Sequence, residues 1–332
     1  MSTADQQLAI GIDVGGTTIK GVLADTRGNI IATSEAVATP RTGAEDVVAA
    51  AARLARTLRK DSPEAPVGAC VPGIIDEEHG IGIFSANLGW KDAPLSEMLS
   101  QALGSFVPLG HDVRSGALAE ALWGVRCSSC LYVAVGTGIA SGLVINSHLA
   151  PGAPWAGEIG QIPVPHPDNP SEIVPLERVA SASGIARRAI EAGILPQGSG
   201  AREVEELANS HEDSSRLAQE ILSTSMSLLG EVLATVCHQV GAIPVVLGGG
   251  LCRGTILAAL VTTESLEEDD QRGAHHRPGQ DRQEEAAEVG DGEGDEHTSV
   301  GRARADVHGH GHRARDRTAG HGGRDDAQRV GG

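Results

Sequence analysis

Ile10-Gly-Ile-Asp-Val-Gly-Gly-Thr-Thr-Ile-Lys20 has the pattern of two apolar strands joined by a turn of glycine and threonine. Gly15 and Gly16 would let the backbone approach an anion with no Cβ atom in the way. Thr17 and Thr18 would add hydroxyl donors to the same turn. An ordinary type I′ or II′ hairpin also uses paired glycines. The turn carries more polar groups than a hairpin needs, so it predicts a phosphate-binding site.

Two charged residues flank this turn. Asp13 ends the first strand, where its carboxylate would lie close to a magnesium ion that accompanies a nucleotide. Lys20 follows in the second strand and completes the pattern Thr-Thr-x-Lys. We therefore expect a nucleotide with Mg²⁺ as cofactor, with Asp13 contacting the metal indirectly.

Composition and charge limit the classes of function. The 332 residues can form two domains of ordinary size. A formal net charge of -18 disfavours nucleic acid as a partner, because a phosphate backbone needs a basic face. The chain opens on polar residues, and no span reads as long and apolar enough for a membrane. We expect a cytoplasmic protein with neither nucleic acid nor membrane as a partner.

The cysteines agree with a reducing compartment. There are five of them, an odd number, spread through a long chain. Cys127-Ser-Ser-Cys130 has the spacing of a redox or metal pair but lacks a second pair. Its place directly before an apolar run favours a loop.

The order of apolar runs predicts two similar α/β units. A strand, a glycine turn and a second strand open the chain, and the same design returns at 131–145 around Gly-Thr-Gly. Two such units facing each other would form a cleft with one phosphate-facing turn on each side. Strands are expected at 7–14, 19–25, 30–38, 66–71, 106–109, 131–135, 140–145 and 244–247, and helices at 43–60, 94–103, 112–123, 176–192, 214–240 and from 251.

The composition changes near residue 262. The large aliphatic residues that follow are only Leu266, Val289, Val300, Val307 and Val330, and no aromatic residue remains. Such a segment cannot bury a core and has the composition of a disordered charged tail. A shifted reading frame in a GC-rich gene is the alternative explanation. The run His308-Gly-His-Gly-His312 in it could capture a metal adventitiously.

Seven motifs in a fixed order resemble the ROK family of sugar kinases and related repressors, over about residues 8–260. The resemblance implies an α/β fold of the actin and hexokinase superfamily, ribonuclease H-like, with two domains around a central cleft. The domains would be 1–110 and 111–262, followed by the tail 263–332, and a homodimer is allowed. The motifs are Asp13-Val-Gly-Gly-Thr-Thr18, Val71-Pro-Gly-Ile-Ile-Asp76, Ser85-Ala-Asn-Leu-Gly-Trp90, Leu109-Gly-His-Asp-Val-Arg114, Val135-Gly-Thr-Gly-Ile139, Ala156-Gly-Glu-Ile-Gly160 and Leu247-Gly-Gly-Gly-Leu251.

The resemblance also implies the roles of individual residues. Asp112 would be the general base that takes the proton of a sugar hydroxyl, although Asp is also a common helix N-cap. The γ-phosphate of ATP would lie at one glycine turn and adenosine at another. The remaining implied residues bind the sugar (Asn87, His111, Glu158, Gln161 and Glu177), the terminal phosphates (Gly136, Thr137 and Gly138) or adenosine (Gly248, Gly249 and Gly250).

The chain departs from the family at its zinc site. Gln161 replaces the usual histidine, and no cysteine lies between 130 and 237, so no zinc is expected. His166 is interpreted as a loop residue. His111 stands where many members have Asn. Nothing after 262 resembles the family's closing strand and helix.

Three functions follow from these observations. The leading one is an ATP- and Mg²⁺-dependent hexose kinase acting at the 6-hydroxyl. A sugar-responsive transcriptional regulator is disfavoured, because only about nine residues precede the phosphate turn and leave no room for a helix-turn-helix. The third is a sugar-binding homologue whose altered C-terminal part prevents turnover.

Overall fold

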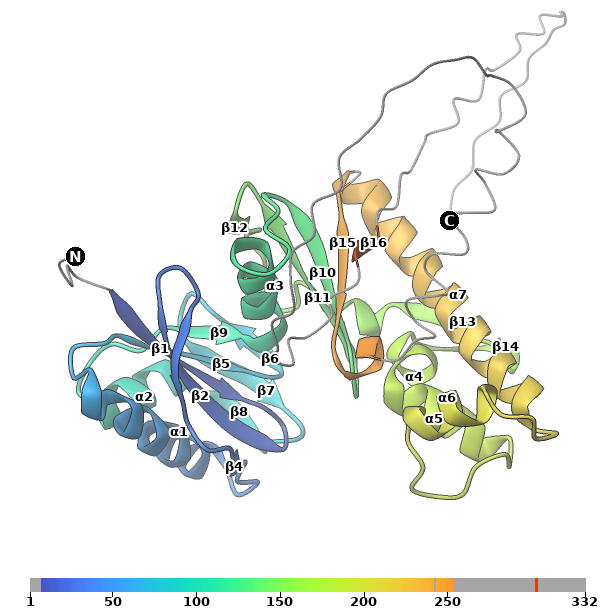
Figure 1. The fold of residues 1–332 in the computed structure, drawn as a ribbon, viewed down its shortest axis with the longest axis horizontal. Helices are drawn as coiled ribbons and strands as arrows, with labels where there is room; N and C mark the ends of the chain where they lie inside the picture. The colour runs from blue at the N-terminus through green and yellow to red at the C-terminus, as the bar shows by residue number, and fades with distance from the viewer. Residues whose placement is uncertain (1–6, 242, 254–301, 304–332) are drawn as a thin grey trace, which may run out of the picture.

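The computed structural model describes residues 7–241, 243–253 and 302–303 (Figure 1). Its elements gather around two main sheets, one built before residue 112 and one after it. The tail predicted over 263–332 and most of the helix predicted from Leu251 lie outside the described residues, apart from Arg302 and Ala303.

The first main sheet confirms the predicted antiparallel opening. β1 pairs with β2 antiparallel and with β5 parallel, and β5 pairs with β9 parallel. β1 alternates, with Ile10, Ile12 and Val14 facing the core, as expected for a strand with one buried face. The strand order is β3-β2-β1-β5-β9, with β4 beside β2. The bounds are β1 Leu8–Val14, β2 Thr18–Asp25, β3 Ile30–Thr33, β4 Val37–Ala38, β5 Val67–Val71 and β9 Leu109–His111.

Two helices, α1 and α2, pack against each other beside this sheet, and α1 contacts β1 and β2. α1 buries Val47, Ala51, Leu54 and Leu58 along one side, as its helical spacing predicts. A three-stranded sheet, β6-β7-β8, was not predicted because its strands are short. The bounds are α1 Ala44–Leu58, η1 Arg59–Asp61, β6 Ile74–Asp76, β7 Ile81–Ser85, β8 Trp90–Ala93 and α2 Leu95–Leu103.

The strand expected at 106–109 is wrong in its position. Pairing with β5 begins at Leu109 and continues to His111, because Pro108 has no N–H to give to a ladder. Phe106 is 77% exposed and lies outside the strand. The shift matters because it places His111 at the end of the strand and Asp112 at the first position of the next helix.

The second main sheet repeats the design of the first. β10 pairs with β11 antiparallel and with β15 parallel, and α3 packs on β10 and β11. The order β12-β11-β10-β15 matches β3-β2-β1-β5. Beyond β15 the described residues hold the two-residue strand β16, which is antiparallel and therefore not a counterpart of β9. The bounds are α3 Asp112–Leu122, β10 Cys130–Val135, β11 Ile139–Ile145, β12 His148–Leu149, β15 Val245–Gly248 and β16 Arg302–Ala303.

A hairpin and four helices complete this part of the chain. The helix expected at 176–192 is divided at Ser181, whose hydroxyl accepts the Gly184 N–H at 3.0 Å and begins a new helix. His166 ends a strand rather than lying in a loop, and α6 was not predicted. The bounds are η2 Ile159–Gln161, β13 Pro163–His166, β14 Asn169–Pro175, α4 Glu177–Ala180, α5 Ala182–Glu191, α6 Ala201–Ala208, α7 Ser215–Val240 and η3 Gly250–Arg253.

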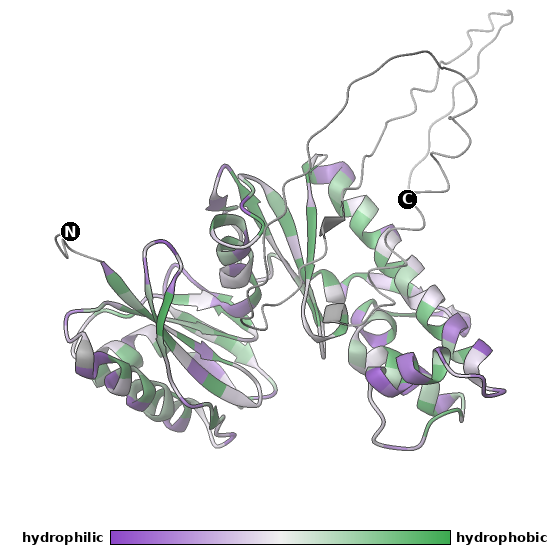
Figure 2. Cartoon of the chain, viewed as in Figure 1, coloured by the Kyte–Doolittle hydropathy of each residue, from purple (hydrophilic) through white to green (hydrophobic). Residues whose placement is uncertain are grey.

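Contrary to expectation, one helix of the described residues is long and apolar enough to cross a membrane by length and composition alone. It is α7, with a mean hydropathy of 1.3 over its most apolar window, 39% of which is buried. Its residues Ile221, Leu222 and Leu229 belong to the core that α4, α5 and α6 share. Figure 2 shows apolar and polar residues alternating along α7. Packing within the protein therefore accounts for much of its apolar character.

Candidate active site

The first glycine turn joins β1 to β2 and is held from behind by Thr39. The Gly15 N–H donates to the Thr18 carbonyl at 2.9 Å. The Thr39 hydroxyl donates to the Gly15 carbonyl at 2.7 Å, and its N–H donates to the Thr17 carbonyl at 2.9 Å. A Cβ on Gly15 would lie 2.9 Å from the Thr18 carbonyl, whereas one on Gly16 would meet open space. Thus the turn itself requires the first glycine but not the second.

The second glycine turn, between β10 and β11, lies against the start of α5. The Gly136 N–H donates to the Gly138 carbonyl at 2.9 Å, and the Gly136 carbonyl accepts from the Ala182 N–H at 2.8 Å. Ala182 is the first residue of α5, and Thr137 is exposed at the tip of the turn. The partial positive charge of a helix N-terminus therefore lies next to a turn predicted to face phosphate.

Replacing Ser181 with Ala should lower the free energy of unfolding by about 1 kcal/mol, because the N-cap hydrogen bond to Gly184 is lost. Chemical denaturation would measure this. The Ser181→Asn variant, which keeps an N-cap acceptor, is the control and should lose less. Equal losses in both variants would contradict the capping role.

The triple glycine at the end of β15 approaches the second turn. Gly249 has φ +95°, and a Cβ there would lie 2.5 Å from the Val135 carbonyl. A Cβ on Gly248 would lie 2.3 Å from the Tyr132 hydroxyl. Close approach to β10 thus explains both glycines. Gly250 lines a cavity of about 550 Å³ together with Ala182.

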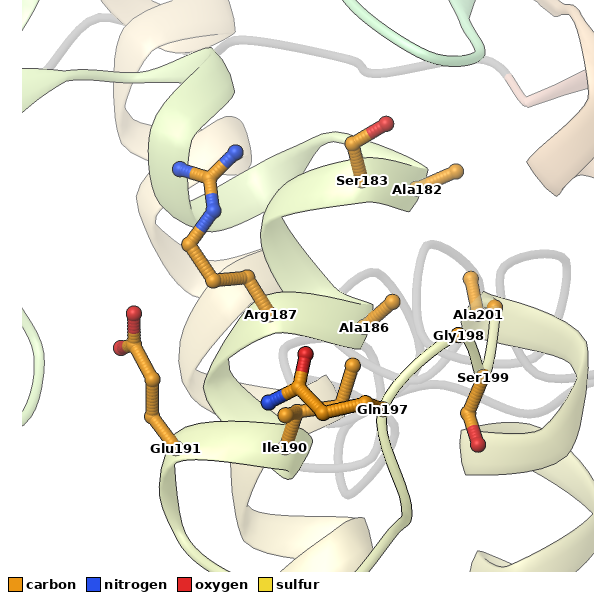
Figure 3. Close-up of a pocket in the computed structure, with 11 residues that line it drawn as sticks. Ala182, Ser183, Ala186, Arg187, Ile190, Glu191, Gln197, Gly198, Ser199 and Ala201 are labelled. Atoms are coloured by element: carbon orange, nitrogen blue, oxygen red, sulfur yellow. The ribbon is translucent and has the colours of Figure 1, made fainter.

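An adjoining cavity of about 500 Å³ lies between α5 and the loop that leads into α6 (Figure 3). Ala186 and Ile190 of α5 line one side, and Ser199 lines the other. The sequence interpretation missed this wall, because α6 has no motif.

Acidic and polar side chains from distant segments meet where β9 joins α3. His111 Nδ1 lies 3.4 Å from Asp112 Oδ1, and His111 Nε2 lies 3.6 Å from Glu158 Oε1. Gln161 Nε2 donates to Glu177 Oε1 at 2.7 Å. Five predicted site residues are thus brought into one neighbourhood, which we call the acid cluster: His111, Asp112, Glu158, Gln161 and Glu177.

Glu177 links the acid cluster to the second glycine turn. Its Oε2 atom accepts the Ile139 N–H at 3.4 Å, and a Cβ on Gly138 would lie 2.7 Å from the same oxygen. It is also the first residue of α4. The helix-cap alternative for Asp112 is wrong, since His111 is the N-cap of α3 and Asp112 is the first helical residue.

Burial and crowding shift the protonation of this cluster. Burial, followed by the charges of Glu177 and Asp112, raises the pKa of Glu158 to about 7. Burial also raises the pKa of Asp112, and the neighbouring His111 opposes that shift. The pKa of His111 is lowered by burial. Carboxyl groups with raised pKa values are common at active sites.

Two residues without a predicted role, Glu77 and Arg114, brace the cluster, and a third, Cys70, contacts Asp13 outside it. Glu77 Oε1 accepts the His111 N–H at 2.8 Å, and Glu77 Oε2 accepts Arg114 Nε–H at 3.1 Å. Arg114 also donates to the Ala150 carbonyl at 3.2 Å. Cys70 donates to Asp13 Oδ1 at 3.7 Å, and burial followed by the Asp13 charge raises the pKa of its thiol to about 12. Arg114 ends one of the quoted motifs without a predicted role, whereas Glu77 and Cys70 lie outside the motifs.

The exposed side chains are placed as follows. Asp13 and Lys20 are exposed on the two strands that carry the first turn. Asn87 is exposed in the turn between β7 and β8, and no hydrogen bond or ion pair among the described residues joins it to the acid cluster. The contact of Asn87 with the sugar therefore remains a prediction.

The chemistry of the donors fits magnesium better than zinc. Mg²⁺ prefers carboxylate oxygens with water, and the Asp13 carboxylate can supply such a contact. In the part of the chain that the structure describes, no group of three or more His, Cys, Asp or Glu side chains is arranged to hold a metal. Burial raises the pKa of Cys130 to about 12, which opposes a metal-bound thiolate. The absence of zinc stays a prediction.

Glu158→Gln should make stability less dependent on pH. A carboxyl group with a pKa of about 7 when folded, against an ordinary value of 4.5, holds more protons in the folded state between those pH values. The unfolding free energy of the native chain should therefore fall as pH rises through that window. Between pH 4 and pH 8, the unfolding free energy of the variant should increase by about 1 to 2 kcal/mol relative to that of the native chain. This value allows for water at the carboxyl group. Chemical denaturation at both pH values tests this prediction. The Glu231→Gln variant, at an exposed glutamate, is the control. The same pH dependence of unfolding free energy in both variants would contradict the prediction.

Comparison with known proteins adds the following findings. A family model described as the ROK family matches residues 9–279. The glucokinase of Halalkalibacterium halodurans is 29% identical over 266 residues, which is 74% of this chain and 80% of the relative. The glucokinase of Thermotoga maritima is 32% identical over 269 residues, 75% of this chain and 84% of the relative. A xylose repressor of Caldicellulosiruptor bescii is 30% identical over 168 residues, 48% of this chain and 42% of the relative.

Solved structures show the same likeness. A ROK hexokinase from Thermus thermophilus has a TM-score of 0.64 and 27% identity, covering 80% of this chain and 88% of that chain. A ROK family glucokinase from Streptomyces griseus, in complex with glucose and AMPPNP, has a TM-score of 0.62 and 24% identity, covering 82% of this chain and 92% of that chain.

Proposed function

Because the chain belongs to the ROK family, we propose that it is an ATP-dependent kinase that transfers a phosphoryl group to the 6-hydroxyl of a hexose. The expected fold of the actin and hexokinase superfamily is confirmed by its likeness to ROK kinases. Glucokinases among its relatives support the sugar kinase class. The observation that carries the proposal is the acid cluster, which adjoins a glycine turn at the start of α5.

Asp112 is the proposed general base. It is the first residue of α3, and its Oδ1 atom accepts the Val113 N–H at 2.8 Å, which orients the carboxyl group. The carboxylate would take the proton of the sugar hydroxyl as the hydroxyl oxygen attacks the γ-phosphate. Catalysis then depends on positioning and on electrostatic stabilisation, since no covalent intermediate is needed.

The acid cluster would bind the sugar hydroxyls. Carboxylates accept hydrogen bonds from hydroxyls, and the neutral Gln161 amide can both donate and accept. His111 and Asn87 are the other proposed contacts. Because Glu158 has a pKa of about 7, its accepting carboxylate form increases with pH through neutrality. Sugar affinity should increase in the same direction.

The glycine turns would bind ATP. The first turn (Gly15, Gly16, Thr17, Thr18) and the second (Gly136, Thr137, Gly138) would bind phosphates through N–H and hydroxyl groups. Adenosine would occupy the cavities beside Gly248–Gly250 and α5. The AMPPNP complex of the Streptomyces griseus glucokinase supports ATP as the phosphoryl donor. Mg²⁺, when bound near Asp13 and Lys20, would neutralise phosphate charge.

A coupled assay of ADP release tests the proposal. The chain is incubated with ATP, Mg²⁺ and, in turn, glucose, N-acetylmannosamine, fructose or allose, and a sugar-free reaction measures background hydrolysis. We expect sugar-dependent ADP release with at least one hexose. Sugar binding by calorimetry without turnover on any hexose would contradict the kinase and favour the impaired homologue.

The regulator remains the alternative from another class, supported by the repressor relative, which this chain matches over 42% of that protein's length. Binding of sugar without ADP release, together with binding to operator DNA, would favour it. The domain boundary at 110, a homodimer, a cytoplasmic location and the absence of nucleic acid and membrane partners remain predictions of the sequence.

A further inference from the structure

His111 lies between two carboxyl groups that have different proposed roles. Its Nδ1 atom is 3.4 Å from Asp112 Oδ1, and its Nε2 atom is 3.6 Å from Glu158 Oε1. The imidazole is 10% exposed, whereas the Asp112 side chain is 32% exposed and that of Glu158 is 19% exposed. The imidazole thus joins the base to a second carboxyl group that is more deeply buried and still reaches water.

The other charged groups around His111 hold it in this place. Glu77 Oε1 accepts the backbone N–H of His111 at 2.8 Å. The backbone N–H of Arg114 donates to His111 Nδ1 at 3.5 Å. With Nδ1 as acceptor, a neutral imidazole carries its proton on Nε2, the atom that faces Glu158. The ring therefore has one acceptor, Nδ1, which faces both Asp112 and the Arg114 N–H and must release that N–H to take a proton, and one donor, Nε2–H, which faces Glu158.

We propose that His111 relays to Glu158 the proton that Asp112 takes from the sugar hydroxyl, an inference that rests on the proposed kinase function. His111 is then a positioning and proton-relaying residue rather than a group that touches the reacting atoms. The relay frees Asp112 for the next turnover by moving its proton to another carboxyl group of the protein.

The protons balance in this transfer. The O–H bond of the protonated Asp112 breaks as a bond forms between that proton and His111 Nδ1. The Nε2–H bond breaks as its proton passes to a carboxylate oxygen of Glu158. Asp112 ends as a carboxylate, the imidazole as its neutral Nδ1–H tautomer and Glu158 as a neutral carboxyl. Glu158 then releases its proton to water, and exchange with solvent restores the first tautomer.

Burial and charge make each partner suitable for its part. The pKa of Glu158 of about 7 lets it accept a proton near neutral pH and release it again. Burial lowers the pKa of His111, which favours the neutral ring that can donate and accept at once. Both separations exceed a normal hydrogen bond, and closure over a bound sugar is the event that would shorten them.

The relay is tested by His111→Gln, which keeps a polar side chain but cannot pass a proton. We expect kcat to fall about 10- to 100-fold, whereas loss of the proposed sugar contact of His111 would appear separately, as a rise in KM. The native kcat should rise with pH through about 7, where Glu158 becomes ionised, and the variant should lose that rise. Added imidazole should partly restore the His111→Ala variant. His79→Gln, at an exposed histidine outside the cluster, is the control.

Two measurements separate this inference from the proposed function. If the native chain releases ADP with a hexose, a His111→Gln variant with unchanged kcat and pH profile overturns the relay. If it releases none, the kinase proposal fails, and nitrogen NMR of the native His111 imidazole still tests whether the ring bridges Asp112 and Glu158. A neutral His111 protonated on Nε2 supports the bridge, and a proton on Nδ1 overturns it.

Discussion

Asp112→Asn is expected to reduce kcat about 10²- to 10⁴-fold while sugar affinity changes less than about threefold. The amide has nearly the shape of the carboxylate and can still accept the Val113 N–H, so α3 should begin as before. It cannot take a proton from the sugar hydroxyl. The loss should therefore appear in turnover and leave binding largely unaffected.

The measurement pairs the ADP-release assay with calorimetry of sugar binding. Asp213→Asn, at an exposed aspartate just before α7, is the matched control and should retain native turnover. Undiminished activity of Asp112→Asn would show that another group accepts the proton. Loss of sugar binding in the same proportion as kcat would instead assign Asp112 to ground-state binding.

Arg188→Met is expected to lower the unfolding free energy by about 3 kcal/mol, because a buried ion pair is broken. This is the low end of the usual range, since the partner Asp168 is half-exposed. The Arg188 side chain is only 2% exposed. Nε and an outer nitrogen donate to the two Asp168 oxygens at 2.8 and 2.7 Å. The other outer nitrogen donates to the Ile221 carbonyl at 2.9 Å and to the Ser225 hydroxyl at 2.8 Å.

Arg188 thus ties the β13–β14 hairpin to α5 and α7, in the segment where the family's thiolate ligands are missing. Its guanidinium lowers the pKa of Asp168, so the pair's contribution should be present above 3.8, the ordinary pKa of an aspartate, and be lost as pH falls below it. Denaturation of Arg188→Met and of Arg187→Met, its exposed neighbour, tests this at neutral pH. Equal losses in the two variants would contradict the structural role.

Much of the fold could be predicted because its signals are local. The alternation of Ile10, Ile12 and Val14, the glycine turns and the stripe of α1 each lie within one element. Short or irregular elements escaped the same reasoning. β6, β7 and β8 are strands of a few residues and α6 is a short helix, so each carries only a brief pattern. A single hydroxyl, that of Ser181, divides a helix that its periodicity would continue.

By itself, the sequence determined the two strand–glycine–strand units, because backbone and turn preferences depend on neighbouring residues. It also predicted a phosphate site at their turns and the residues proposed for it. Only the tertiary structure decided which side chains meet. His111 and Glu158 come from different elements, and Glu77 and Arg114 brace them by hydrogen bonds that no motif encodes. The pKa of about 7 at Glu158 likewise depends on burial and on two distant carboxylates. Such contacts arise from packing between elements, which local preferences do not specify.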